Sequence, residues 1–290
     1  MMNKRSITLL VTALAASNYV SAADLAITHY NLGENAIFPA SSVLVSGEKE
    51  LMLFDAQFSV KDGKKLVEQI KESGKELSMI YISSGDPDYY FGLEPIVAAF
   101  PDVKVVASEA VVKHIERTKD AKLAYWGPIL EEGAPSKIVV PTVLNDTTLM
   151  LEGKRIEVKE INTHDAYLWV PSEKTVFGGV SVYSGVHVWM ADTQSKQERT
   201  QWSQSLERMK ALKPKTVIPG HYLGDMPKGV EGVQFTMNYI ADIEQTLEKS
   251  SKPSSSEISA AMKAKYPQFA ATEGDLELGA KVLSGEMEWH

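Results

Sequence analysis

Cysteine is absent from this sequence of 290 residues, and this absence excludes disulfide bonds as a source of stability. The fold must therefore be held together by its hydrophobic core, and a chain of this length can bury one large core or two small ones. A chain without thiols also suits an oxidising compartment.

Basic charge is scarce as well. Lysine and arginine number 30 against 38 aspartates and glutamates, which gives a formal net charge of −8. The phosphates of a nucleic acid would be repelled by such a chain, and no stripe of basic residues offsets the excess. We therefore expect no nucleic-acid partner.

Long apolar runs are missing beyond the N-terminus. Near the start, Lys4 and Arg5 precede an apolar run over residues 7–16, and residues 20–22 read VSA, a small-x-small cleavage pattern. The apolar run is too short for a membrane anchor. We expect residues 1–22 to be a cleaved signal peptide, and the mature protein to be periplasmic or secreted with no membrane attachment.

The pattern of apolar residues and turns predicts alternating blocks of strands and helices. Strands are expected at residues 41–45, 51–54, 77–82, 103–107, 147–151, 156–161, 166–170, 175–177 and 216–218, and helices at residues 61–73, 93–100, 108–118 and 199–212. This order indicates two similar halves, and two sheets packed face to face with helices outside would satisfy it.

The C-terminal part is expected to be helical. Ser254 and Glu257 form a capping-box pattern that opens one helix, just after the polar tract at residues 249–256. We expect one domain over residues 23–250 and a helical extension over residues 251–290 that packs on the same domain.

Ligand-type residues follow several of the predicted strands, where loops on a rigid sheet can converge on one point. The positions are Asp86 and Asp88 in "YISSGDPDYYFG", His164 in "NTHDA", the bend at residues 178–180, and His221 in "PGH". A plain turn is an alternative explanation for residues 85–88, since Gly, Asp and Pro are common turn residues. We expect the two aspartates and two histidines to meet at one pocket.

From about residue 35 to about residue 225 the sequence resembles the metallo-β-lactamase fold superfamily. Asp55 in "LMLFDAQF" matches the early structural aspartate of that family, and Gly92 matches the glycine that ends its His-x-His-x-Asp-His signature. The resemblance implies an α+β fold, a four-layer αββα sandwich, here with extra C-terminal helices.

The resemblance also implies a set of metal ligands, from which this chain departs. Ser84, Asp86, Asp88 and Tyr89 occupy the four signature positions, His164 and His221 match the later histidines, and Val180 stands at the bridging aspartate. Two complete metal sites cannot be assembled from these residues. One site from Asp86, Asp88, His164 and His221 is possible, holding zinc or a harder ion such as manganese or iron.

Two functions of different classes follow from the resemblance. In the first, the exported protein is a metal-dependent hydrolase of a small-molecule ester, lactone, thioester or amide. Asp88 and Tyr89 would then be catalytic, with the Tyr89 hydroxyl donating to an oxyanion, and Ser84 and His187 would contact the substrate. In the second, the protein has lost its metal and only binds a small molecule.

Several residues have simpler explanations. The alternative for His187 is a packed aromatic neighbour of Trp189 in place of a substrate contact, and we expect Trp126, Trp169 and Trp189 in the core and at its rim. The sequence specifies neither the substrate nor the oligomeric state.

Overall fold

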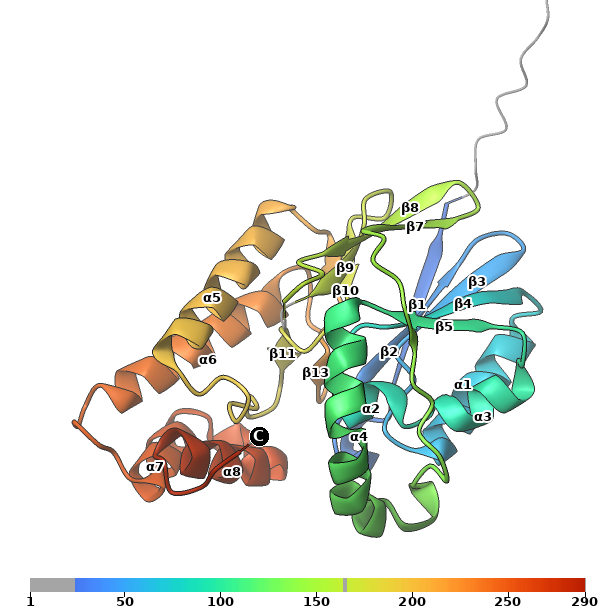
Figure 1. Cartoon of the computed structure of the whole chain (residues 1–290). Helices are drawn as coiled ribbons and strands as arrows, with labels where there is room; N and C mark the ends of the chain where they lie inside the picture. Colours follow the sequence, from blue (N-terminus) through green and yellow to red (C-terminus); the bar gives the residue numbers. More distant parts are fainter. Residues whose placement is uncertain (1–23, 164–165, 290) are drawn as a thin grey trace, which may run out of the picture.

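The computed structural model describes residues 24–163 and 166–289. The expected signal peptide and His164 lie outside the described residues. Within them, a strand-rich part is followed along the chain by a mainly helical part, and the two lie side by side (Figure 1).

The first sheet has its strands in the order in which they occur along the chain: β1 (Ala26–Asn31), β2 (Ser41–Ser46), β3 (Glu50–Phe54), β4 (Glu76–Ile82), β5 (Lys104–Ala107) and β6 (Thr142–Val143). The first three are antiparallel, and β3 to β6 run parallel. Alternation along β3 explains why the sheet separates two cores. Leu51 and Leu53 enter the core beneath the helices, whereas Met52 and Phe54 enter the core between the sheets.

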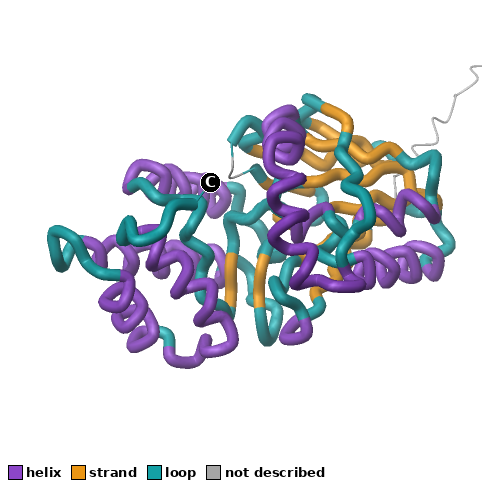
Figure 2. The backbone as a smooth tube through the Cα atoms, turned by 60° about the horizontal axis from the view of Figure 1, so that its bottom comes forward, coloured by secondary structure: helices purple, strands orange, loops and turns teal. Residues whose placement is uncertain are grey.

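The second sheet has the spatial order β12 (Thr216–Val217), β10 (Thr175–Phe177), β9 (Tyr167–Val170), β8 (Lys154–Lys159) and β7 (Thr148–Leu151). Its inner face meets the first sheet, where Phe177 packs edge-on against Phe54 with ring centroids 4.9 Å apart. A short parallel pair, β11 (Tyr183–Ser184) and β13 (His221–Tyr222), follows at the edge. This pair lies between the strand-rich and helical parts (Figure 2).

Helices cover both outer faces, which confirms the expected αββα sandwich. The first sheet is covered by α1 (Val60–Glu72), α3 (Leu93–Ala99) and α4 (Glu109–Leu130), and the second by α5 (Lys196–Ala211) and α6 (Glu231–Leu247). The extra C-terminal helices are α7 (Ser255–Lys265), which opens with the expected capping box, and α8 (Glu273–Leu283). Ile258 and Leu276 from these helices join the same core as Trp202 of α5.

One difference from the sequence-based expectation bears on the site. The helix expected to end at residue 118 continues to Leu130, with Pro128 inside its last turn. Leu123, Trp126 and Leu130 in the added turns pack against the core beneath the helices, and this tertiary packing stabilises the extension. None of the helices within residues 24–163 and 166–289 has the length and apolar character needed to cross a bilayer.

Candidate active site

The site begins in the loop after β4, where the local sequence dictates a sharp turn into a short helix. Asp86 has extended backbone angles and precedes α2 (Pro87–Tyr90), whose first residue is a proline. Proline suits this position because its φ is already helical and its missing N–H is not needed there. Gly92 follows, and a Cβ on it would lie 2.0 Å from the Ala56 carbonyl oxygen. The glycine therefore allows the loop to pack directly on the end of β3.

A chain of buried hydrogen bonds fixes this loop to its neighbours. The backbone N–H and the hydroxyl of Ser83 both donate to the Asp55 carboxylate, at 2.7 and 2.6 Å. The Ser83 oxygen in turn accepts a hydrogen bond of 2.7 Å from the Gly179 N–H. The ends of β3, β4 and β10 are thus joined through two side chains. Burial raises the pKa of Asp55 to about 7, against the opposing effect of the Ser83 hydrogen bonds.

Asp88 and His221 form the polar centre of the site. The Asp88 Oδ2 atom lies 2.6 Å from Nε2 of His221, and both residues are buried. The imidazole stacks on the ring of Tyr183, with centroids 5.0 Å apart and planes 13° from parallel. Its Nδ1 atom is buried without a hydrogen-bond partner among the residues that the structure describes. A carboxylate acceptor at Nε2 favours the tautomer that carries hydrogen there.

Asp86 points away from this pair. Its Oδ1 atom lies 2.9 Å from the ammonium nitrogen of Lys122 on α4, and its Oδ2 accepts a hydrogen bond of 3.1 Å from the Ser84 hydroxyl. Asp86 therefore faces α4, whereas Asp88 faces β13. The two aspartates of the motif line one pocket but have different partners.

Tyr89 is oriented differently from the expectation. It is completely buried, and its hydroxyl donates to the Gly179 carbonyl oxygen at 3.1 Å. Burial, with Asp88 nearby, raises the pKa of the phenol well above its ordinary value, so it keeps its proton. Because that proton is engaged by the Gly179 carbonyl, the role expected for Tyr89 as an oxyanion donor does not match this geometry. The tyrosine instead holds the bend before Val180.

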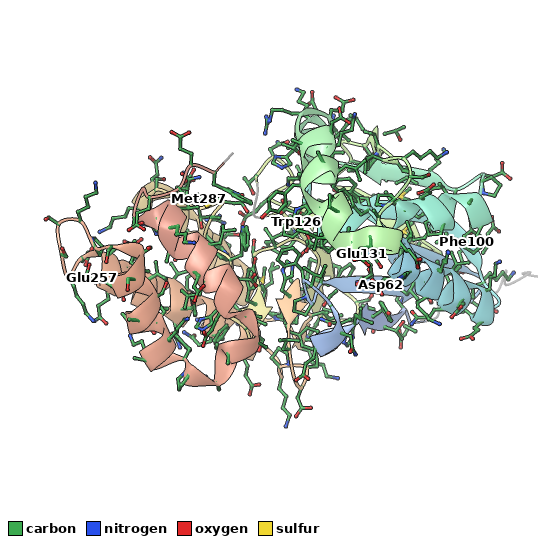
Figure 3. The ribbon with its side chains drawn as sticks, turned by 90° about the horizontal axis from the view of Figure 1, so that it is seen from below. Asp62, Phe100, Trp126, Glu131, Glu257 and Met287 are labelled. Carbon is green, nitrogen blue, oxygen red and sulfur yellow. The ribbon has the colours of Figure 1, made fainter. Side chains whose placement is uncertain are left out.

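The site opens into a pocket. The space within it and its open mouth, bulk solvent included, is about 990 Å³. Four of the five tryptophans in the sequence line it, namely Trp126, Trp189, Trp202 and Trp289. Trp126 lies on the side of α4 that faces the C-terminal segment carrying Met287 (Figure 3). Trp126 and Trp189 pack at the rims of the two cores, as expected, and both also contribute to the pocket wall.

The other expected site residues are divided between the pocket and its surroundings. The pocket is lined by four of them, Asp86, Asp88, His187 and His221. Ser84 is not part of the lining and donates a hydrogen bond to Asp86. His187 is buried, and its Nδ1 lies 2.9 Å from the Tyr239 hydroxyl. Burial lowers the pKa of His187 to about 4, so the ring is neutral near pH 7. His164, the remaining member of the expected set, lies outside the described residues.

Sequence reasoning missed Lys122, Asp275 and Trp289. A signal for the first was present, because Lys122 lies eight residues after His114 and four before Trp126, which places all three on one helical face. Extending the predicted helix would have found it. Asp275 and Trp289 belong to the C-terminal part, and no local pattern indicates that they face a pocket more than 180 residues away along the chain from Asp88.

The described residues supply only part of a metal-ligand set. Within residues 24–163 and 166–289, no three histidine, aspartate or glutamate side chains are grouped so that they could hold a metal. Asp88 and His221 are adjacent, but Tyr89 and Val180 supply no ligand at the positions needed for a second ion. A single ion at Asp88 and His221 would need a third ligand, and the sequence-based candidate is His164.

Comparisons with known proteins agree with this architecture. A sequence model of the metallo-beta-lactamase superfamily matches residues 36–221. A metallo-beta-lactamase family protein from Thermus thermophilus is 18% identical, with a TM-score of 0.58 over 90% of this chain and 94% of that one. A metallo-beta-lactamase from Pontibacter korlensis is 19% identical, with a TM-score of 0.51 over 76% and 100% of the two chains. No curated protein matches. At such identities the structural likeness shows the fold alone.

Proposed function

We propose a function from the premise that this chain belongs to the metallo-β-lactamase superfamily, whose members usually use divalent metals, most often zinc. The protein is a hydrolase of a small-molecule ester, lactone, thioester or amide, and it works with an altered site. The observation that carries the proposal is the Asp88–His221 pair, held at 2.6 Å in the wall of a deep aromatic pocket.

The proposal includes one divalent ion. Asp88, His164 and His221 would hold it, because they keep the ligand types of the family. When bound, the ion polarises the substrate carbonyl and makes a water molecule more acidic. Asp86 is a less suitable ligand than the sequence indicated, because its carboxylate is paired with Lys122.

The chain's own residues position and protect the reacting groups. Asp88 accepts the hydrogen at Nε2 of His221, and stacking on Tyr183 fixes the plane of the imidazole. Both side chains are thereby held in fixed orientations in the pocket wall, as ligands of the proposed ion must be. The pocket wall is mostly apolar, which strengthens electrostatic interactions inside the pocket relative to open water.

The test uses untagged protein, because a histidine tag would bind metal itself. Metal content is measured by elemental analysis, and hydrolysis is measured on a panel containing one ester, lactone, thioester and amide with the same aromatic body. We expect Asp88→Asn and His221→Gln each to lower kcat/KM by about 100-fold or more. We also expect about one equivalent of bound metal in the parent protein, and both variants should lower it.

Asp120→Asn is the matched control. This aspartate lies on α4, and its side chain is 85% exposed. It should leave kcat/KM and metal content unchanged. Equal activity in Asp88→Asn and Asp120→Asn would contradict the hydrolase proposal.

A second candidate function is ligand binding without catalysis. It is favoured by three particular arrangements: Lys122 pairs with Asp86, the Tyr89 hydroxyl is engaged by Gly179, and Val180 is buried with apolar neighbours. In this alternative, aromatic small molecules raise the melting temperature equally with and without a chelator. A chelator that lowers the melting temperature by several degrees would count against it.

We also propose export to the periplasm or the exterior. The support is the sequence of residues 1–22, with its basic start, apolar run and VSA pattern. Expression of the full chain in a Gram-negative host should give a mature protein that begins at Ala23, as measured by intact mass. Recovery of the full chain from the cytoplasm alone would contradict export.

A further inference from the structure

An arc of aromatic rings forms one wall of the pocket. Phe38 contacts Trp126 edge-on at 5.2 Å and Trp189 edge-on at 5.9 Å, so it joins α4 to the loop before α5. Trp189 then meets Trp289 at 5.5 Å. We call these four residues the aromatic arc. The negative faces of such rings attract cations, and tryptophan does so most strongly.

One carboxylate orients two rings of the arc. Oδ2 of Asp192 accepts the indole N–H of Trp189 at 2.6 Å, and Oδ1 accepts that of Trp289 at 2.9 Å. Each indole is held by its N–H edge, which fixes the orientation of the ring. The same contacts place a negative charge beside the arc. An aromatic surface and a carboxylate are therefore combined at one position.

The charges that line the pocket are predominantly negative. The carboxyl groups of Asp86, Asp88, Asp192 and Asp275 all face it. Among the described residues, Lys122 is the only lysine or arginine in the lining, and Asp86 already pairs with it. Against these four carboxyl groups, Lys122 supplies one positive charge and the divalent ion of the proposed function would supply two.

Asp275, in the first turn of α8, has the least compensation. It makes no hydrogen bond or ion pair with any residue in the described part of the chain, although it is largely shielded from water. Burial raises its pKa to about 7, and the nearby Asp88 carboxylate adds to this effect while His221 opposes it. A shielded carboxyl without a partner is costly to ionise, and a cation brought beside it would remove that cost.

We propose that the pocket binds an organic cation, a quaternary ammonium or protonated amine with an aromatic or apolar body, whose charged end lies between Asp275 and the aromatic arc. This inference deepens the proposed function and rests on it, because it names the substrate class of the same pocket. The class consists of esters or amides that carry a positive charge.

Neutral and anionic ligands fit the pocket less well. A neutral ligand would remove water from the carboxylates without providing a counter-charge, which costs free energy. An anion placed between Asp275 and the aromatic arc would lie beside the carboxyl groups of Asp275 and Asp192. The combination of charge and aromatic surface therefore selects a cation.

The experiment compares three ligands of nearly equal size: phenyltrimethylammonium, its neutral carbon isostere tert-butylbenzene, and the anion benzoate. Binding to the mature full-length protein is measured at low ionic strength by calorimetry and by tryptophan fluorescence, which reports on the pocket because four tryptophans line it. We expect the cation to bind at least about tenfold more tightly than either of the other two.

Two variants locate the binding site. Asp275→Asn should weaken the binding of phenyltrimethylammonium at least fivefold and leave the affinity for tert-butylbenzene unchanged. Glu277→Gln is the matched control, because Glu277 is on the same helix but pairs with Lys263 on α7 and does not line the pocket. Trp289→Leu should weaken the binding of the cation more than the binding of the isostere. Circular dichroism verifies that each variant is folded.

The outcomes separate the two proposals. Equal affinity for the cation and the isostere, or tighter binding of benzoate, would overturn the cation proposal and leave the hydrolase proposal standing. Loss of hydrolysis in Asp88→Asn together with selective cation binding would support both. In a third outcome the protein has no hydrolytic activity but binds phenyltrimethylammonium selectively, and neither Asp88→Asn nor a chelator changes this binding. That outcome would support the cation proposal and contradict the hydrolase proposal.

Discussion

The ammonium group of Lys122 lies 2.9 Å from the carboxylate of Asp86, and both side chains are only about one-fifth exposed, at 19% and 21%. The family resemblance suggests Asp86 as a metal ligand. In this chain the ion pair brings a positive charge from α4 to that carboxylate. An ion pair of this burial competes with metal binding, because the ammonium must move before a metal can approach the carboxylate.

Lys122→Met should therefore increase the affinity of the untagged protein for Mn²⁺ by at least about fivefold, since it removes both the competing ammonium and its repulsion of a divalent cation. Isothermal titration with Mn²⁺ measures the change. Lys119→Met is the control, because Lys119 pairs with the exposed Asp120 on the same helix. If both variants match the parent protein, Asp86 takes no part in metal binding.

Gly179→Ala should be strongly destabilising. The glycine has φ +71°, and an added Cβ would lie 2.1 Å from the Ala166 carbonyl oxygen. We expect a loss of more than about 2 kcal/mol in the free energy of unfolding, measured by urea denaturation. Gly74→Ala isolates the backbone cost, because Gly74 has φ +65° and no atom within 4 Å of the added Cβ. Gly74→Ala should lower the free energy of unfolding by only about 1 kcal/mol. Equal losses in the two variants would contradict the steric argument.

Ser83→Ala removes the hydroxyl that joins Asp55 to Gly179. A buried carboxylate and a buried amide then each lose a partner, so we expect a loss on the order of 3 kcal/mol in the free energy of unfolding. Ser203→Ala provides the comparison, because its hydroxyl donates only to the Arg199 carbonyl within α5. Ser203→Ala should change the free energy of unfolding by less than about 0.5 kcal/mol. A small effect at Ser83 would mean that another group satisfies Asp55.

Acid should destabilise the protein partly through His187. Its pKa is about 4 in the folded state against 6.5 for the free side chain, because burial disfavours the charged ring. As the pH falls below 6.5 the unfolded chain binds a proton first, so the contribution is fully present above pH 6.5 and is lost towards pH 4. The maximum loss is about 3 kcal/mol. His187→Phe should flatten this part of the stability profile, measured by denaturation from pH 7 to pH 4.5. An unchanged slope would assign the acid sensitivity to other groups.

Much of the fold could be predicted because its signals are local. Short apolar runs bounded by turns located β2, β3 and β4 to within one residue at each end, and the pair Ser254 and Glu257 located the start of α7. The approach of Asp88 to His221 was also expected, since both follow buried strands and match the family motif. Their roles as metal ligands stay predictions.

The direction of individual side chains was not predictable in the same way. Tyr89 occupies a ligand position, yet its hydroxyl donates to Gly179 because a buried phenol needs an acceptor and that carbonyl lies within reach. Trp126 packs against the rim of the core as expected, but its additional place in the pocket wall depends on the C-terminal segment that faces it. The end of α4 was misplaced because packing against the core extends that helix.

The sequence by itself determined the layered scaffold and the position of the acidic turn, because these depend on residue types and their spacing. Only the tertiary structure decided that Lys122 neutralises Asp86 and that Asp275 and the aromatic arc line the same pocket as Asp88. These relationships join α4, the loop before α5 and the C-terminal helix. No local rule specifies which faces of such distant segments meet, because that choice depends on how all of the buried surfaces pack together.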